Sequence, residues 1–354
     1  MKVTDFQQSA SRSFVDAVAE EIDSAVMALA DVFEFASIYG MSTDMTTYDI
    51  TGDGYQYTGL YGWLMEDALT DNIRDANDNG AAGATVTLSM LDEMYAVTVG
   101  KYRNFAREPY MWFMSQGMID KISGLQTRIT RDAPSVDFEG AFTMQTYKGI
   151  PMLPSHFCSP ESSTASPASP AITTASGGSL ADDTYYYRVA AITLYGEQVA
   201  AAEVNATTSG THSTVTLSWT ADTDAKLYAI YRGLTTGDNN LGLLDIIPAL
   251  TYTAAGKFST NVSSYSDDGT ITETAAIQPL DSGEEVVFLA NVGARYGLSR
   301  PVLSPTLGSP VNDLIHYIPI PVATDEWAFR LKHFGAVQVP RGESSCMLRR
   351  AKTS

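Results

Sequence analysis

The sequence predicts an α+β protein that carries an inserted all-β sandwich. Three observations predict it: a long helical period in Ser13–Gly40, a break in composition after Cys158, and strand-like alternation from Leu180 to about Ser266. From Val286 the mixed character returns, so the first part of the chain continues beyond the β-rich segment. Such an insertion is tolerated where its two ends lie close together on the host surface. We therefore expect an α/β core made of residues 1–158 and 281–354, with a linker and sandwich at 159–280.

The segment Ser13–Gly40 has the strongest helical pattern of the chain. Its apolar residues recur every three or four positions, which keeps them on one helix face, at Phe14, Val18, Ile22, Val26, Leu29, Phe33 and Ala36. Acidic residues crowd the first turns, where they complement the positive end of the helix dipole. Gly40 follows the last periodic residue, as a C-terminal cap does. The spacing predicts a helix over residues 13–39, roughly 40 Å long at ~1.5 Å per residue.

The other elements of the first part follow from weaker patterns. In chain order we expect strands and turns after Gly40, a short helix at Met65–Arg74, a loop at Asp75–Gly83, a helix opening at Thr87, a strand at Pro109–Gln116 with Ser115 near its end, a helix at Met118–Gln126, and strands at 134–157 around a turn at Lys148-Gly149. This order of helix, strand and helix indicates a mixed α/β unit.

The middle of the chain has two compositions. Ser159–Ser179 consists largely of Ser, Thr, Pro and Ala without a period, which is typical of a linker. Apolar and polar residues then alternate in Tyr185–Ala191, Thr214–Thr220 and Lys226–Arg232. Short alternating strands separated by Gly-rich turns predict a small β-sandwich.

Composition excludes several classes of function. The net charge of −19 argues against non-specific nucleic-acid binding, which needs a basic face, and favours solubility. No apolar run approaches the ~20 residues that span a bilayer, and the N-terminus lacks the apolar core of a signal peptide. We therefore expect a soluble protein that is not exported by that route. Cys158 and Cys346 fit no metal spacing and indicate free thiols, although a bridge between them stays open.

A search for chemistry-bearing motifs finds none of the common ones. The sequence contains no G-x-S-x-G elbow, Walker loop, H-E-x-x-H or Cys-x-x-Cys. The histidines are scattered, at His156, His212, His316 and His333. Asp75–Gly80 and Asp49–Gly54 match half of a calcium loop but lack the Glu at position twelve, so we interpret both as turns. Arg349, Arg350 and Lys352 are too few to make a nucleic-acid site. We predict no catalytic, cofactor-binding or metal-binding residues, no cofactor and no enzymatic activity.

The order of these segments resembles the major capsid proteins of tailed bacteriophages of the Hong Kong 97 type. Ser13–Gly40 is similar to the spine helix of that family, TLSMLDEMYAVTVGKYRN and PYMWFMSQGMIDKISGLQ to its axial-domain helix, strand and helix, and TYKGIPMLPSHF to a recurrent strand. VVFLANVGARYGLSRP and FRLKHFGAVQVPRGESSCML resemble its closing strands. In one departure, only a dozen residues precede Ser13, where the family has an N-terminal arm and an extended loop that lock neighbouring subunits.

The resemblance implies a structural head protein. Its copies would form the hexamers and pentamers of an icosahedral shell that encloses double-stranded DNA without binding it specifically. Portal, scaffold and decoration proteins would be its partners, and no membrane would be involved. The resemblance places the protein in the virion, after assembly in the host cytoplasm.

The inserted segment has a resemblance of its own. GGSLADDTYYYRVAAITLYGE, VTLSW and LYAIYRG are similar to fibronectin type III sequences, which have an immunoglobulin-like fold. The pieces similar to late strands come first, which implies a circularly permuted sandwich on the outer face of the shell. An alternative stays open, in which the chain is a phage or cell-surface adhesin whose sandwich binds a host glycan or protein.

Overall fold

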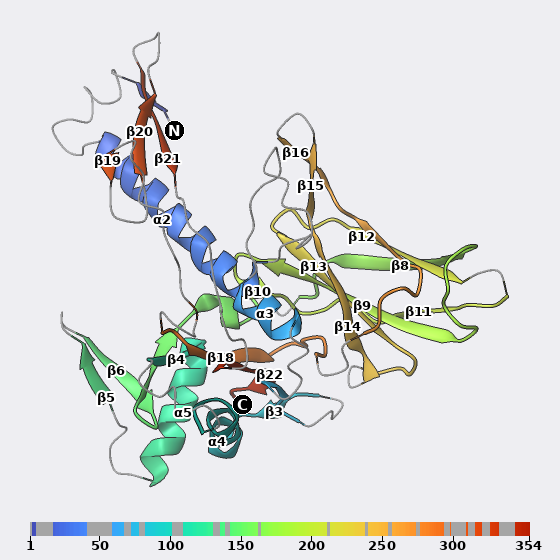
Figure 1. Cartoon of the computed structure of the whole chain (residues 1–354), viewed down its shortest axis with the longest axis horizontal. Coiled ribbons are helices and arrows are strands. Elements are labelled where there is room, and N and C mark those ends of the chain that lie inside the picture. Colours follow the sequence, from blue (N-terminus) through green and yellow to red (C-terminus); the bar gives the residue numbers. More distant parts are fainter. Residues whose placement is uncertain are drawn as a thin grey trace.

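The computed structural model describes most of the chain (Figure 1). The described residues are 2–4, 17–40, 59–66, 72–77, 82–100, 109–129, 135–138, 142–161, 164–210, 213–237, 240–253, 257–273, 277–293, 298, 309–310, 316–320, 326–332 and 344–354. They form a mixed α+β protein, in agreement with the predicted class. No described helix is long and apolar enough to cross a membrane.

An eight-stranded sheet is the centre of what we call the body. Its order is β2-β22-β18-β4-β7-β6-β5, and β3 also pairs with β22. The strands are β2 (Ile73–Asp75), β3 (Ala84–Thr85), β4 (Tyr110–Met114), β5 (Ser135–Phe138), β6 (Phe142–Tyr147), β7 (Ile150–Pro154), β18 (Glu285–Asn291) and β22 (Cys346–Lys352). β22 lies inside the sheet, antiparallel to β18 and parallel to β2 and β3. The sheet therefore joins strands from both ends of the sequence.

Helices cover the body sheet where the sequence predicts them. Thr87 caps helix α4 (Leu88–Tyr95) by accepting a hydrogen bond from Met90 N, and a π-helical turn (η2, Ala96–Gly100) continues it. Helix α5 (Gln116–Ile129) directly follows β4. Both helices pack on the sheet through a cluster of buried side chains that includes Leu91, Trp112, Met118, Ile122 and Leu348. The predicted turn at Lys148-Gly149 is confirmed, since both residues have positive φ (51° and 78°), as a two-residue hairpin turn requires.

Helix α2 (Ala17–Tyr39) confirms the long helix of the prediction, and the expected start at Ser13 lies outside the described residues. Its last turn packs on helix α3 (Leu60–Glu66). Gly59 lies against this turn, where a Cβ would come within 2.7 Å of Ala36 O, and its N–H donates to Gly40 O (2.6 Å). The carbonyl at the helix end is therefore satisfied by the approach of Gly59.

The β-rich segment forms a sandwich of two antiparallel sheets. The five-stranded sheet contains β9 (Thr184–Thr193), β10 (Gly196–Glu197), β11 (Val204–Thr207), β13 (Leu227–Gly233) and β14 (Gly242–Pro248). The three-stranded sheet contains β8 (Ala168–Ala175), β12 (Thr214–Thr220) and β17 (Ser264–Asp267). Their facing sides share one hydrophobic cluster, to which Tyr187, Leu217, Trp219 and Ile230 belong. The predicted sandwich is present, and the boundaries of the domains stay a prediction.

The five-stranded sheet is buried on both faces. In β9 and β13, Val189 and Ile230 pack inside the sandwich, whereas Ile192 and Ala229 pack in a second cluster with α2, α3 and β18 of the body. Every residue of β13 is buried. The sheet is thus a layer shared by the sandwich and the body, rather than part of a module standing on a surface loop.

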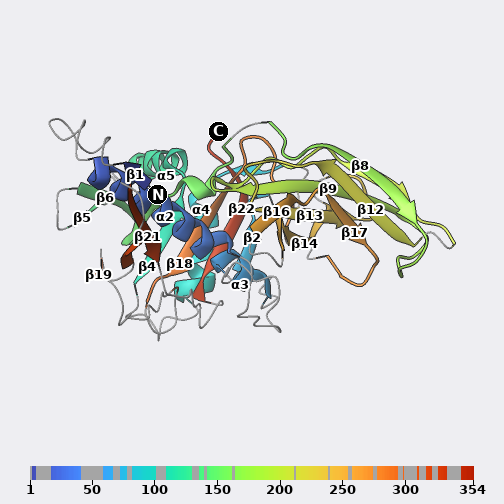
Figure 2. The ribbon, with the colours of Figure 1, turned by 90° about the horizontal axis from the view of Figure 1, so that it is seen from above.

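A third group of strands lies at the other end of the molecule. β1 (Lys2–Thr4), β19 (Ser309–Pro310), β20 (His316–Ile320) and β21 (Glu326–Lys332) form a four-stranded sheet in the order β1-β21-β20-β19. This sheet lies beside the N-terminal half of α2, and together they extend away from the body (Figures 1 and 2). We call this sheet and residues 17–31 of α2 the arm.

Two sequence expectations are wrong. Met65–Arg74 is not a helix, because α3 ends at Glu66 and Ile73 and Arg74 belong to the parallel strand β2. The expected linker contains strand β8, which pairs with β12 along its length. Its Ala, Ser, Pro and Thr residues hide the strand in the sequence, since Ile172 alone supplies a large side chain to the core. A separate two-stranded sheet, β15 (Leu250–Thr253) with β16 (Lys257–Asn261), follows β14.

Candidate functional site: a buried junction and an exposed arm

The residues weighed for chemistry in the sequence do not come together. The ring of His156 lies against that of Phe157, with centroids 4.0 Å apart and planes tilted by 37°, and beside that of Tyr195. His316 begins β20, and His212 and His333 lie outside the described residues. Within the part of the chain that the structure describes, no three His, Cys, Asp or Glu side chains are grouped to hold a metal ion. Cys158 and Cys346 are buried free thiols.

The described part of the first half-match to a calcium loop, residues 75–77, is held by hydrogen bonds of its own side chains. Asp75 Oδ1 accepts from Asn77 N (2.7 Å), and Asn77 Nδ2 donates to Ala82 O (2.7 Å). The other oxygen of Asp75 lies 3.2 Å from Arg350 Nη1. Both carboxylate oxygens are thus engaged, in agreement with the interpretation as a turn. The second half-match, Asp49–Gly54, lies outside the described residues.

Ser115 acts as a helix cap between β4 and α5. Its Oγ accepts from Met118 N (3.1 Å) and donates to the carboxylate of Glu285. Burial raises the pKa of the Glu285 carboxyl above its ordinary value, partly opposed by the hydrogen bonds from Ser115 and Ser159. This arrangement fastens the start of α5 to β18, which is a structural task.

A fully buried ion pair joins the body to the sandwich. Arg349 of β22 forms an ion pair with Glu197 of β10, with Nη1–Oε2 2.8 Å and Nη2–Oε1 2.9 Å. Its guanidinium also donates to Tyr61 OH of α3 (2.9 Å), Tyr231 OH of β13 (3.2 Å) and Gln278 O (2.8 Å). The Arg349 and Glu197 side chains are 1% and 0% exposed. We call these five residues the junction.

The charges of the junction depend on one another. Burial by itself would lower the pKa of Arg349, but the Glu197 carboxylate raises it well above the ordinary value. Burial also raises the pKa values of Tyr61 and Tyr231, so both hydroxyls stay protonated and Tyr231 donates to Glu197. Removing one member of such a buried pair leaves the other charge without compensation, which costs about 3–5 kcal/mol. The junction therefore makes the sandwich and the body dependent on each other.

Two adjacent arginines are buried because strand β22 bulges. The pairing of β18 with β22 shifts register between Glu285 and Val287, and Arg350 has φ +57°. A bulge redirects successive side chains that would otherwise alternate across a sheet. Arg349 therefore turns to the sandwich, while Arg350 pairs with Asp75 and lies 3.6 Å from Glu284. The sequence indicates only that these arginines are too few for a nucleic-acid site, and it does not predict their buried ion pairs.

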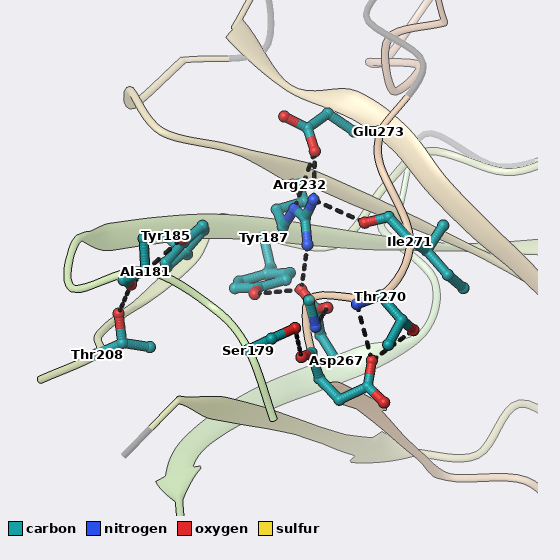
Figure 3. Close-up of polar contacts among 12 residues, drawn as sticks. Ser179, Ala181, Tyr185, Tyr187, Thr208, Arg232, Asp267, Thr270, Ile271 and Glu273 are labelled. Atoms are coloured by element: carbon teal, nitrogen blue, oxygen red, sulfur yellow. Dashed lines mark hydrogen bonds and ion pairs between the residues drawn. The ribbon is translucent and has the colours of Figure 1, made fainter. Parts of the chain in front are cut away.

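A second ion network fastens the chain where it leaves the sandwich (Figure 3). Arg232 of β13 binds Asp267 Oδ2 (2.8 Å), the carboxylate of Glu273 and Ile271 O (2.9 Å). Tyr187 OH of β9 donates to the same Asp267 oxygen (2.7 Å). Residues 267–273 lead from the last sandwich strand back toward the body, so Arg232 holds this return segment on the five-stranded sheet.

The arm has a different environment. The hydrophobic clusters formed by the described residues include α2 only from Phe35 onward. Toward the N-terminus the stripe residues Ile22 and Val26 are half-buried, and Met27, which lies beside the stripe, is 69% exposed. An amphipathic helix normally packs its apolar stripe against another element. Among the described residues of the arm, Ile22 and Val26 of this stripe are therefore only partly covered.

No protein-family profile matches the sequence, and no curated protein matches it. Among solved structures, the fold is similar to a chain of the holo-SrpI encapsulin complex from Synechococcus elongatus PCC 7942. That likeness covers 100% of this chain and 72% of that chain, with 10% sequence identity and a TM-score of 0.48.

Proposed function

We propose that this chain is the subunit of a self-assembling protein shell, of the kind that tailed-phage major capsid proteins form. The observation that carries the proposal is the arm. Helix α2 has 23 residues, about 34 Å at ~1.5 Å per residue, and among the described residues its side chains join a hydrophobic cluster only from Phe35 onward. Neighbouring copies would cover the rest, since rings and shells repeat the same contact between identical chains.

The arrangement of the elements also supports a capsid-like subunit. The order of segments in the sequence resembles that family, and the structure has the long helix beside an extended antiparallel sheet. In the proposal α2 is the spine helix, and the body with α4 and α5 packs around the axis of each hexamer or pentamer. The protein is then structural rather than enzymatic. It belongs in the virion, around double-stranded DNA, with portal and scaffold proteins as partners.

We propose in addition that the strands of the sandwich are arranged as in an immunoglobulin-like fold. In such sandwiches strand C lies beside strand F. The sequence resemblance assigns β13 to the early strands and β9 to the late ones, and these two strands pair. The adhesin alternative would use the sandwich as a separate recognition module. The shared five-stranded sheet disfavours that alternative, because separation would expose one of its apolar faces.

Sedimentation velocity with negative-stain electron microscopy tests the proposal. We expect rings or closed particles far heavier than the 38.2 kDa chain. Acidic copies repel one another, so raising the salt concentration from about 0.05 M to about 0.5 M is expected to shift the protein toward particles. A monomer or trimer that persists at all salt and protein concentrations would overturn the proposal and favour the adhesin alternative.

A further inference from the structure

The outward face of the arm helix carries a line of carboxylates around an exposed methionine. Glu20, Asp23, Met27 and Asp31 follow one another at intervals of three or four residues, which places them along one face of α2. All four are exposed, Met27 by 69%. At ~3.6 residues per turn, this face lies about 150° from the apolar stripe of the helix. Because α2 contains no basic residue, its carboxylates have no partner on the helix itself.

The sheet of the arm has two faces of different composition. The antiparallel pairing of β1, β20 and β21 brings even-numbered residues onto one face and odd-numbered residues onto the other. The odd-numbered residues of these strands are Val3, Tyr317, Pro319, Trp327, Phe329 and Leu331. The even-numbered residues include three bases, Lys2, Arg330 and Lys332, and one acid, Glu326. One face is therefore apolar and the other is basic.

The helix and the sheet of the arm place opposite charges on its two outer sides. A sheet that is apolar on one face buries that face against another element. Helix α2 contacts β21 and lies beside the sheet (Figures 1 and 2), so we assign the apolar face to the side of the helix. The basic residues of the sheet are then on the side away from α2, and the exposed carboxylates of α2 are on the side away from the sheet. We call these two sets the acidic face, which is Glu20, Asp23, Met27 and Asp31, and the basic face, which is Lys2, Ile318, Ile320, Arg330 and Lys332.

The acidic and basic faces are complementary in charge and similar in length. Met27 lies between Asp23 and Asp31 on the acidic face. On the basic face, Ile318 is the register partner of Arg330. Each face thus combines an apolar residue with flanking charges, and interfaces generally have an apolar core with a polar rim. The acidic face extends over roughly 17 Å at ~1.5 Å per residue, and the basic face over roughly 14 Å at ~3.4 Å per residue along β21.

We propose that the acidic face of one copy binds the basic face of the next copy, head to tail. The proposal rests on the proposed function and names the two surfaces that meet there. Each copy can use both faces at once, because they lie on opposite sides of the arm. A contact between two different surfaces generates rings when the rotation from copy to copy closes. In a chain with a net charge of −19, acidic surfaces repel one another, so a basic face directs the contact to this partner.

Charge reversal with complementation tests this contact. Asp23→Lys with Asp31→Lys gives a helix variant whose acidic face becomes basic, and Arg330→Glu with Lys332→Glu gives a sheet variant whose basic face becomes acidic. Either variant alone should form several-fold fewer particles than the wild type, since like charges then meet across the contact. An equimolar mixture should recover even-membered rings in which the two variants alternate, because each altered face then meets the opposite charge.

A matched control makes the same change of net charge outside the arm. Glu161→Lys with Asp224→Lys replaces two exposed acids, so this variant should assemble at least as well as the wild type. Salt screens both the attraction between the two faces and the repulsion between acidic chains, so all variants are compared at one salt concentration at which the wild type assembles. Urea denaturation identifies any variant that does not fold, and the single substitution Asp31→Lys or Arg330→Glu then takes its place.

The outcomes separate this proposal from the proposed function. If the wild type forms particles and the mixture recovers no more of them than either variant alone, or both variants assemble like the control, the contact is overturned and the shell proposal stands. If the wild type forms no particle, the shell proposal fails, and sedimentation equilibrium at about 1 mM protein, the concentration that a short tether supplies, decides on the contact. A mixture that associates several-fold more strongly than either variant alone then supports the contact, and equal association overturns it.

Discussion

The sandwich and the arm both extend from the body, but they are attached in different ways. The sandwich shares a fully buried sheet with the body and is fixed by the ion pair between Arg349 and Glu197. The arm continues from the buried end of α2 and leaves Met27 exposed. The difference indicates that the sandwich is part of the protomer's own fold, whereas our proposal assigns the arm to contact with another copy. Substitutions at the junction should therefore lower the free energy of unfolding, whereas substitutions in the arm should change the sedimentation of the assembled protein.

The largest loss of stability is expected from Arg349→Met. The substitution leaves Glu197 buried without its partner, which should lower the free energy of unfolding by about 3–5 kcal/mol. Urea denaturation followed by circular dichroism and by tryptophan fluorescence measures this loss. Lys148→Met is the control, because Lys148 pairs with Asp92 at the surface, where an ion pair contributes about 1 kcal/mol or less. Equal effects of the two substitutions would contradict the assigned role of the junction.

A pair of glycine substitutions tests how closely the sandwich approaches the body. Gly196 has φ +93°, and a Cβ there would lie 2.1 Å from Phe157 O, so Gly196→Ala forces β10 away from the body backbone. Gly210 also has a positive φ, +60°, but has open space around it. We expect Gly210→Ala to cost about 1–2 kcal/mol for the left-handed conformation alone. Gly196→Ala should cost clearly more, and a cost no greater than that of Gly210→Ala would show that the approach is not tight.

Substitution in the arm should leave the fold intact and impair assembly. Met27→Glu changes an exposed residue, so the free energy of unfolding should stay within about 0.5 kcal/mol of the wild type. The added charge at an interface between copies should move the sedimentation profile from particles to free chains. Leu234→Glu, at an exposed apolar residue of the sandwich, is the matched control and should assemble normally. Normal assembly of the Met27→Glu protein would contradict the proposal that the arm, unlike the sandwich, is needed for contact between copies.

The smallest effect expected is a pH dependence of the free energy of unfolding that comes from Glu285, which fastens the start of α5 to β18 through Ser115. Burial raises its carboxyl pKa in the folded protein, so the neutral form is favoured there and ionisation reduces stability. The contribution of Glu285 is therefore most favourable below its unfolded pKa of about 4.3 and declines as pH rises through the folded pKa. Glu285→Gln should remove this decline. Urea denaturation of both proteins from pH 4 to 7 should show their stability difference shifting toward the variant as pH rises, and an opposite shift would contradict this assignment.

The sequence predicted the elements that depend on residues close together in the chain. The long helix, the cap at Thr87, the turn at Lys148-Gly149 and the alternation in β12 all follow from short-range spacing. Strand β8 could not be recognised in the same way, because small residues on both of its faces give no alternation. Its position depends on pairing with β12, about forty residues later.

The junction was beyond the reach of the sequence for a related reason. Arg349 and Glu197 are separated by 152 residues, and nothing close to either residue indicates the other. The one local signal was the run of two arginines in strand β22, between the apolar residues Cys346–Leu348 and Ala351, where a regular strand would send one side chain to each face. The predicted capsid-like assembly likewise depends on surfaces between copies, which a single chain does not display.

Hydrogen exchange measured by mass spectrometry on free chains and on assembled particles tests the central claim most directly. The account predicts that peptides from residues 17–31 gain protection on assembly. Peptides from β9 and β13 should be strongly protected in both states, since their sheet is already buried in the single chain. Unchanged exchange at 17–31, with new protection confined to β9 and β13, would contradict the claim that the arm is made for neighbours and the shared sheet for the fold.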